Sequence, residues 1–168
     1  YRRIRNTFRF IMGNLNDFDE KSNNVNKNDL VEIDKWIISE AIKLHEEVQK
    51  LNDNYAYHHV IQKIHNFCVH ELGGVYLDII KDRMYVTKSN SYARRSAQFA
   101  LFEVAEILIR LISPILVFTA EEIWQSHELF KKQSVSIFMA SQKALSEIES
   151  SISDEDWKKI FAVKDAVN

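Results

Sequence analysis

Glycine and proline are scarce in this chain, with three glycines and one proline among 168 residues. A fold of many short strands needs these residues at its turns, so their scarcity argues against such a fold. Long segments that lack both residues permit continuous helices instead. We therefore predict an all-α protein, and a chain of this length suits one domain with a substantial core.

Cysteine and long apolar runs are scarce as well. The single cysteine, Cys68, excludes an internal disulfide and a multi-cysteine zinc site. Because it lies between Phe67 and Val69, we expect it to be buried as a small apolar residue. No apolar stretch reaches about 18 residues and no signal-peptide pattern opens the sequence, so we predict a cytoplasmic protein without a membrane span.

The net charge of −2 lacks the excess of positive charge that announces a nucleic-acid binder. The charges are unevenly distributed, however. Residues 1–15 hold four arginines and no acid, whereas residues 113–168 hold six lysines and nine acids. A local basic patch of this kind is compatible with RNA contact.

Apolar residues recur at helical spacing over most of the chain. The predicted helices span residues 2–15, 29–51, 57–85 and 93–111, followed by a short helix after 119 and a last helix from 153. Antiparallel helices joined by short loops make a helical bundle. We expect this bundle over residues 1–130, and an acidic extension over 131–168 that holds one short strand at 134–139 and the start of a helix leading into a further module.

Local signals mark the predicted helix ends. Asn28 is the expected N-cap of the second helix, and Thr119 with Glu122 forms an expected capping box. The Gly-Gly pair at 73–74 predicts a bend in the third helix. No capping residue precedes Arg2, so we expect the first helix to belong to a longer one.

The first helix carries the clearest surface pattern. Its apolar stripe is Ile4, Phe8, Ile11 and Leu15. The opposite face holds the main predicted RNA-binding residues, which are Arg2, Arg5, Asn6 and Arg9. Three guanidiniums without a carboxylate among them repel one another, and RNA phosphates relieve that repulsion. An ion-paired or solvated face is the structural alternative, and the spacing alone leaves both open.

Other charges project differently. On a straight third helix Asp78 and Asp82 fall in the apolar arc, and Arg94 does so on the next helix, level with Asp82 across the turn. The sequence therefore predicts a partly buried structural ion pair between Arg94 and one of these carboxylates. The remaining cations of this region project outward. The secondary RNA contacts predicted among them are Lys81, Arg83 and Arg95.

Patterns that indicate catalysis or metal binding do not occur. The six histidines and one cysteine fit no closed tetrahedral zinc site, so no metal is predicted. A Gly-rich phosphate loop and a nucleophile elbow are absent, which predicts no catalysis by this chain alone. Most aromatic residues are predicted to be core, Trp124 among them. Those near loops, predicted to be exposed, are Phe18, Tyr55, Tyr92 and Phe130.

Four stretches of the sequence are similar, in order and spacing, to isoleucyl-tRNA synthetases of the bacterial type. They are residues 1–19 (YRRIRNTFRF through GNLNDFD), 76–83 (YLDIIKDR), 93–98 (ARRSAQ) and 113–124 (SPIL with FTAEEIW). The likeness covers nearly all of residues 1–130 and is loose beyond them. In this combination the four stretches resemble the anticodon-binding domain of that family.

The resemblance implies a helical bundle that binds the anticodon stem and loop of tRNA(Ile). The parent enzyme activates isoleucine with ATP and transfers it to tRNA, in a catalytic domain whose HIGH and KMSKS signatures this sequence lacks. The editing domain and the zinc-binding C-terminal module are missing too. The resemblance thus implies a monomeric chain that has no cofactor of its own and contacts the missing domains intramolecularly, while the parent uses ATP, Mg²⁺ and zinc.

Two alternatives remain at this point. The first alternative is the equivalent domain of a valyl- or leucyl-tRNA synthetase. The DIIKDR run at 78–83 argues against it. From a different class, it is a helical protein–protein interaction module without an RNA role. Titration with tRNA separates the RNA-binding readings from the last one.

Overall fold

The computed structural model describes residues 1–19, 25–141, 145, 148 and 150–167. Over these residues it is all-α, as predicted, and contains no strand. The α-helices are α1 (Arg2–Asn14), α2 (Glu32–Asp53), α3 (Tyr57–Val69), α4 (Leu77–Tyr85), α5 (Tyr92–Ile112), α6 (Val117–Ser126), α7 (Glu128–Gln133) and α8 (Asp154–Val167). The other helical segments are two 3-10 turns, η1 (Lys27–Asp29) and η3 (Ile137–Met139), and the π-helical η2 (His70–Tyr76).

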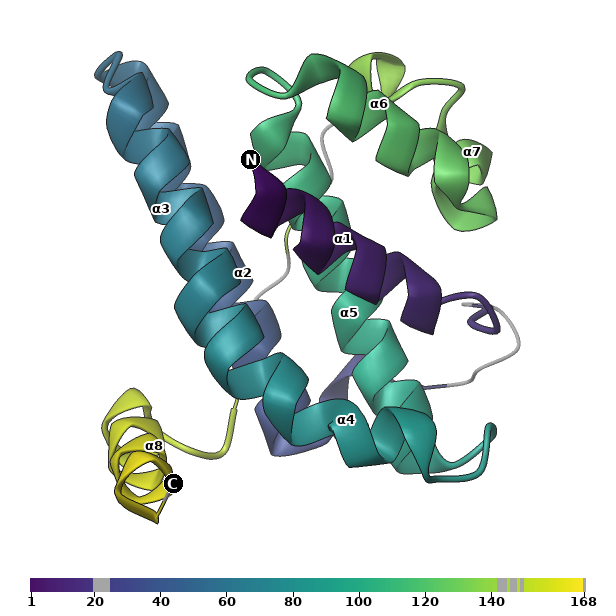
Figure 1. The fold of residues 1–168 in the computed structure, drawn as a ribbon, viewed down its shortest axis with the longest axis vertical. Coiled ribbons are helices and arrows are strands. Elements are labelled where there is room, and N and C mark those ends of the chain that lie inside the picture. The colour runs from purple at the N-terminus through teal and green to yellow at the C-terminus, as the bar shows by residue number, and fades with distance from the viewer. Residues whose placement is uncertain (20–24, 142–144, 146–147, 149, 168) are drawn as a thin grey trace.

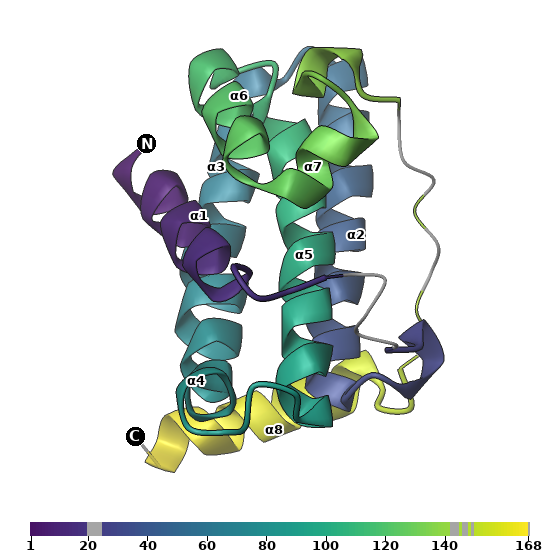
Figure 2. The same cartoon turned by 90° about the vertical axis from the view of Figure 1, so that its right-hand side faces the viewer.

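Three rods form the bundle. One is α2, the second is the continuous run of α3, η2 and α4, and the third is α5, and they pack side by side (Figures 1 and 2). α1 lies obliquely across α3 and α5. α6 and α7 lie at one end of the rods, and α8 lies across the opposite end (Figure 2). No helix in the described part of the chain is both long and apolar enough to cross a membrane.

α5 is the central element of the core. Every residue from 96 to 109 is buried, since this helix carries apolar side chains around almost its whole circumference. The apolar stripe predicted for α1 is buried against it and α3. Trp124 and Cys68 are fully buried, which confirms both predictions.

The rod of α3, η2 and α4 stays helical through the Gly-Gly pair, and its axis changes direction between α3 and α4, in agreement with the predicted bend (Figure 1). The Gly-Gly pair lies inside η2, where the backbone makes π-type rather than α-type turns. A Cβ atom added to Gly73 would lie 2.7 Å from the carbonyl oxygen of Cys68 and 2.7 Å from a guanidinium nitrogen of Arg3. Glycine is therefore needed at position 73 for the close approach of backbone and guanidinium.

Three local predictions were wrong. The segment 134–139 forms no strand, because Glu121 of α6 accepts hydrogen bonds from the Ser136 hydroxyl and the Ile137 N–H, and η3 follows. Asn28 is not the N-cap of α2, which starts at Glu32 after η1. α6 begins at Val117, so the expected capping box lies inside the helix.

The C-terminal helix packs on the bundle through aromatic rings. Trp157 and Phe161 lie 5.9 Å and 4.7 Å from the Trp36 ring of α2, centroid to centroid. The Lys43 ammonium and the Asp154 carboxylate form a 2.7 Å ion pair at the start of α8. α8 is therefore attached to α2 by both apolar and charged contacts, while the domain division at residue 130 stays a prediction.

Candidate nucleic-acid interface

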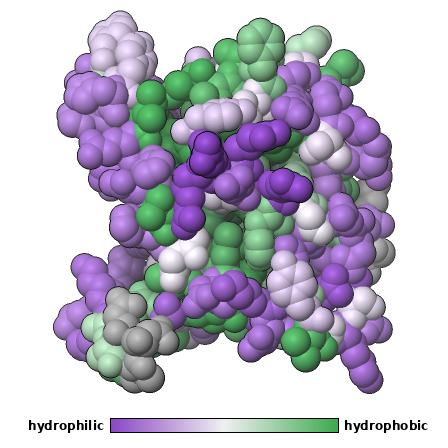
Figure 3. Space-filling model, viewed as in Figure 1, coloured by the Kyte–Doolittle hydropathy of each residue, from purple (hydrophilic) through white to green (hydrophobic). Residues whose placement is uncertain are grey.

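The predicted basic face of α1 is on the surface. Arg2, Arg5, Asn6 and Arg9 are all exposed, opposite the buried stripe. Figure 3 shows strongly hydrophilic side chains over α1 in the middle of this view of the molecule. The helical pattern that predicted this face is therefore confirmed, and the role of these residues in RNA binding stays a prediction.

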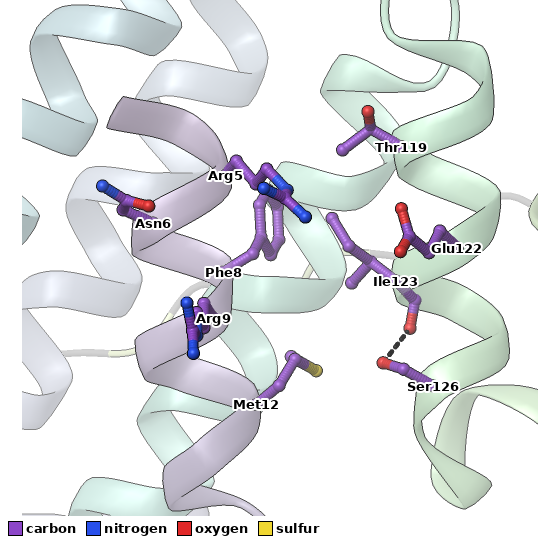
Figure 4. A pocket seen from close by; sticks show the side chains of 9 residues that line it. All are labelled: Arg5, Asn6, Phe8, Arg9, Met12, Thr119, Glu122, Ile123 and Ser126. Atoms are coloured by element: carbon purple, nitrogen blue, oxygen red, sulfur yellow. Dashed lines mark hydrogen bonds between the residues drawn. The ribbon is translucent and has the colours of Figure 1, made fainter. Parts of the chain in front are cut away.

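A groove separates this face from α6. It has a volume of about 290 Å³. Its lining from α1 is Arg5, Asn6, Phe8, Arg9 and Met12, and from α6 it is Thr119, Glu122, Ile123 and Ser126. Figure 4 shows the guanidinium of Arg5 directed toward α6, with the carboxylate of Glu122 on the facing side.

The groove combines positive charge, apolar surface and one carboxylate. Phe8 and Ile123 are buried at its base, whereas Arg5, Arg9 and Glu122 are exposed at its rim. In the described residues, the arginines that form ion pairs are Arg83, Arg94, Arg95 and Arg110. The guanidiniums of the groove are thus available for an anionic ligand, which arginine binds bidentately.

The structure assigns Arg94 and Arg95 to a different task from the predicted one. Arg94 donates to the Asp17 carboxylate at 3.0 Å, and Arg95 donates to the Asp17 carbonyl oxygen at 2.8 Å. Gln98 donates to the same carboxylate at 2.7 Å and to the Asn14 carbonyl at 2.8 Å. The ARRSAQ stretch therefore fixes the end of α1 on α5.

Arg83 is also structural. It forms a bidentate ion pair with Asp34 of α2, with N–O distances of 2.8 Å and 3.0 Å. The Asp34 side chain is fully buried. Tyr76 and Ser96 donate to the same carboxylate at 2.7 Å and 2.6 Å. Burial raises the pKa of Tyr76 well above its usual range, and the Asp34 charge raises it further. The phenol therefore stays protonated and remains a donor.

The predicted pair of Arg94 with Asp78 or Asp82 does not form. Asp78 lies on the surface and accepts from Lys81 at 2.7 Å, and Asp82 is exposed too. The physical reason is η2. A π-helical turn takes in about one residue more than an α-turn, which rotates the following residues by about 100° relative to a straight helix. The rotation turns Asp82 outward and brings the next residue, Arg83, inward.

Of the secondary RNA contacts, only Lys81 stays exposed, and it is paired with Asp78. Of the four aromatic residues predicted to be exposed near loops, two are exposed and two are buried. Tyr55 and Tyr92 are exposed as predicted, whereas Phe18 and Phe130 are buried in the core, so that prediction was wrong for both. Exposed phenol rings offer stacking surfaces for bases, though these two lie outside the groove.

The Cys68 thiol is buried in the core. Burial raises the pKa of Cys68 to about 11, although a Thr7 hydrogen bond and the Arg3 charge act in the opposite direction. The thiolate is therefore scarce near neutral pH. In the part of the chain that the structure describes, no group of three or more His, Cys, Asp or Glu residues is arranged to hold a metal ion.

The α6 side of the groove was missed by the sequence reasoning. Thr119 and Glu122 were interpreted as a helix cap, and Ser126 had no signal at all. These α6 residues line the groove only because α1 packs against α6. The two helices are separated by more than a hundred residues of sequence. No local pattern carries that information.

The fold and this groove define a helical bundle with a basic, partly apolar groove on its surface. A family model described as the anticodon-binding domain of tRNA ligase matches residues 34–168, so the chain belongs to this family.

Three relatives of this chain are isoleucine–tRNA ligases. The isoleucine–tRNA ligases of Pseudomonas aeruginosa strain LESB58 and Pseudoalteromonas translucida strain TAC 125 are both 46% identical to it, over 171 and 170 residues. That of Caldicellulosiruptor saccharolyticus is 45% identical over 169 residues. Each match covers 99–100% of this chain, and the chain spans 18% of each relative's length.

Proposed function

We propose that this chain is the anticodon-binding part of an isoleucine–tRNA ligase and holds the anticodon arm of tRNA(Ile). The family match and the shared name of the relatives support this assignment. The full-length protein would be a cytoplasmic monomer that joins isoleucine to tRNA. Its ATP and Mg²⁺ would be held in a catalytic domain and its zinc in a C-terminal module, all outside this chain.

The observation that carries the proposal for this chain is the α1–α6 groove. Arg5 and Arg9 are exposed at its rim and match phosphate oxygens, which position an RNA backbone. Glu122 faces them with a carboxylate that accepts from the amino groups of bases. An unstacked loop nucleotide presents both a phosphate and a base edge, and single-stranded loops are the usual target of specific RNA recognition.

The test is a titration with tRNA(Ile) over a series of salt concentrations. Changing Arg5 and Arg9 together to alanine is expected to weaken binding about a hundredfold at low salt, since two charged contacts of roughly 1.5 kcal/mol each sum to about 3 kcal/mol. The slope of log K against log salt is expected to flatten by about 1.4–1.8, because each phosphate contact contributes about 0.7–0.9. Circular dichroism checks that the fold is unchanged.

The matched control changes Lys158 and Lys159 to alanine. These exposed α8 residues carry the same total charge but lie away from α1. The control variant is expected to keep nearly the wild-type affinity and slope. If both double variants bind tRNA(Ile) as the unchanged chain does, the RNA surface lies elsewhere.

The same titration separates the alternatives. Preference for tRNA(Val) or tRNA(Leu) over tRNA(Ile) would point to the related synthetases. An absence of binding to every tRNA, even at low salt and in the full-length protein, would favour a protein–protein interaction module.

A further inference from the structure

The α1–α6 groove carries opposite charges on its two walls. Arg5 and Arg9 are exposed on the α1 side, and Glu122 is exposed on the α6 side. Of the described residues that line the groove, Glu122 alone is acidic. Figure 4 shows the Arg5 guanidinium directed toward α6 and the Glu122 carboxylate on the facing wall. A ligand between these walls meets donors on one side and an acceptor on the other.

Glu122 differs from the neighbouring acid of α6 in its contacts. Glu121 accepts hydrogen bonds from the Ser136 hydroxyl at 2.9 Å and the Ile137 N–H at 3.2 Å, which hold the segment after α7 on α6. Glu122 is the next residue of the helix and is therefore turned away by about 100°. Among the described residues it accepts no hydrogen bond and forms no ion pair. Its carboxylate is thus available to a ligand in the groove.

The size and base of the groove suit one nucleotide. Its volume of about 290 Å³ is at the lower limit of small-molecule pockets, which hold roughly 300–1,000 Å³. Phe8 and Ile123 form an apolar base, and the half-buried Met12 adds a thioether. Thioethers make favourable contacts with aromatic rings, so the face of a nucleobase fits this surface while its polar edge meets the charged wall.

The hydrogen-bonding pattern of a carboxylate distinguishes among the bases. Its two oxygens lie side by side and accept two parallel hydrogen bonds. Guanine presents two adjacent donors, the N1–H and the 2-amino group, on its Watson–Crick edge. Adenine, cytosine and uracil each present one donor group there. Unpaired bases are read on this edge, so a carboxylate in this position matches guanine best.

We propose that the α1–α6 groove is a guanine-specific subsite, in which Glu122 accepts from the N1–H and the 2-amino group of an unpaired guanine in RNA. The inference rests on the proposed function, because it takes the ligand to be RNA held at its phosphates by Arg5 and Arg9. The Glu122 charge repels phosphates, so the backbone lies on the α1 side and the base points toward α6. The groove thus selects the base and also fixes the orientation of the strand.

Fluorescence anisotropy with short RNAs tests the base preference. The probes are the labelled pentanucleotides UUGUU, UUAUU, UUCUU and UUUUU, titrated with this chain at low salt. UUGUU is expected to bind about tenfold more tightly than UUUUU, a typical discrimination for a bidentate contact to a base. Inosine in place of the guanosine lacks only the 2-amino group and is expected to lose most of this preference. Equal affinity for all pentanucleotides would overturn the proposal.

Glu122→Gln tests whether the carboxylate carries the preference. An amide presents one acceptor and one donor, and the donor opposes the 2-amino group of guanine. The variant is expected to reduce the preference for UUGUU at least about fivefold, while UUUUU binds at least as tightly as before because a repelling charge is gone. A preference that survives in this variant would overturn the assignment to Glu122.

The control variant is Glu155→Gln on α8. It removes the same charge from a side chain that is 81% exposed and lies away from α1. This variant is expected to keep the preference for UUGUU. If it loses the preference as Glu122→Gln does, the effect is one of overall charge and the proposal fails.

Two further comparisons identify the ligand and separate this inference from the proposed function. Guanosine 5′-monophosphate that competes as well as unlabelled UUGUU would identify a site for the free nucleotide and overturn the assignment to RNA. The Arg5 and Arg9 double variant is expected to weaken all four pentanucleotides alike, since its contacts are to phosphates. Loss of tRNA(Ile) binding in that variant, without a guanine preference in the unchanged chain, would refute this inference alone.

Discussion

At the residue scale, Asp34 organises the polar interior. Asp34 receives hydrogen bonds from Tyr76, Arg83 and Ser96, which connects α2 to η2, α4 and α5. Ser96 also accepts from the Val31 N–H at 3.0 Å, just before α2 begins. A buried carboxylate with four donor contacts is fully satisfied, and such networks are costly to break because any remaining charge loses its partner.

Asp34→Asn is expected to destabilise the domain by about 3 kcal/mol, since it leaves the Arg83 guanidinium without a countercharge beside a buried site. Urea unfolding followed by circular dichroism measures the change. Asp78→Asn is the control, because it removes a carboxylate whose ion pair with Lys81 is solvent-exposed. The control is expected to leave the unfolding midpoint unchanged, and equal midpoints for the two variants would show that the Asp34 network contributes little.

At the scale of elements, η2 decides how the long rod meets its neighbours. Its π-type turns let α3 and α4 run on without a break while shifting the phase of the residues that follow. Arg83 faces Asp34 because of that shift. Arg3 of α1 also lies over this segment, close to Gly73, where only a hydrogen atom fits.

Substituting the glycines of two helices with alanine is expected to have opposite effects. Gly13→Ala in α1 is expected to stabilise the protein by about 0.4–1 kcal/mol, because nothing lies within 4 Å of the added Cβ and alanine restricts the unfolded chain. Gly73→Ala is expected to destabilise it by about 1–3 kcal/mol, because the Cβ lies 2.7 Å from a backbone carbonyl oxygen that cannot easily move. Thermal unfolding of both variants measures the difference, and stabilisation by both would show that η2 relaxes without cost.

At the scale of the whole molecule, the attachment of α8 connects the end of the described chain to the bundle. Glu32 in the first turn of α2 accepts from the Ser151 N–H at 2.9 Å and from the Ser150 hydroxyl at 3.0 Å. It also accepts from Lys35 at 2.8 Å. Partial burial raises the pKa of Glu32, but the hydrogen bonds from Lys35, Ser151 and Ser150 together lower it to about 2 from 4.5.

This lowered pKa predicts a pH-dependent contribution to stability. Glu32 binds a proton more readily in the unfolded chain than in the folded one, so its contribution is complete above pH 4.5 and is lost as the pH falls toward 2. Glu32→Gln is therefore expected to be less stable than the unchanged protein at pH 6, by a margin that shrinks at pH 4 and pH 3. Urea unfolding, followed by the fluorescence of Trp36 and Trp157, measures it. A margin that is constant over this range would contradict the assignment.

The sequence predicted the parts of the fold that depend on local patterns. The stripe of α1, the long helices and the burial of Cys68 follow from helical spacing and side-chain polarity, which neighbouring residues define. The ARRSAQ and YLDIIKDR stretches identified the family correctly. The predicted ion pair of Arg94 with Asp78 or Asp82 was wrong, because the assignment of side chains to helix faces assumed a straight α-helix through 70–76.

What the sequence determined by itself was the all-α class, the family and the basic face of α1. The tertiary structure alone decided which charges meet, since Asp34 and Arg83, or Asp17 and Arg94, are brought together only when the rods pack. It also formed the groove, one wall of which comes from α1 and the other from α6. Helical periodicity is a property of neighbours along the chain, whereas a buried ion pair or a groove depends on the distance between segments that are remote in sequence.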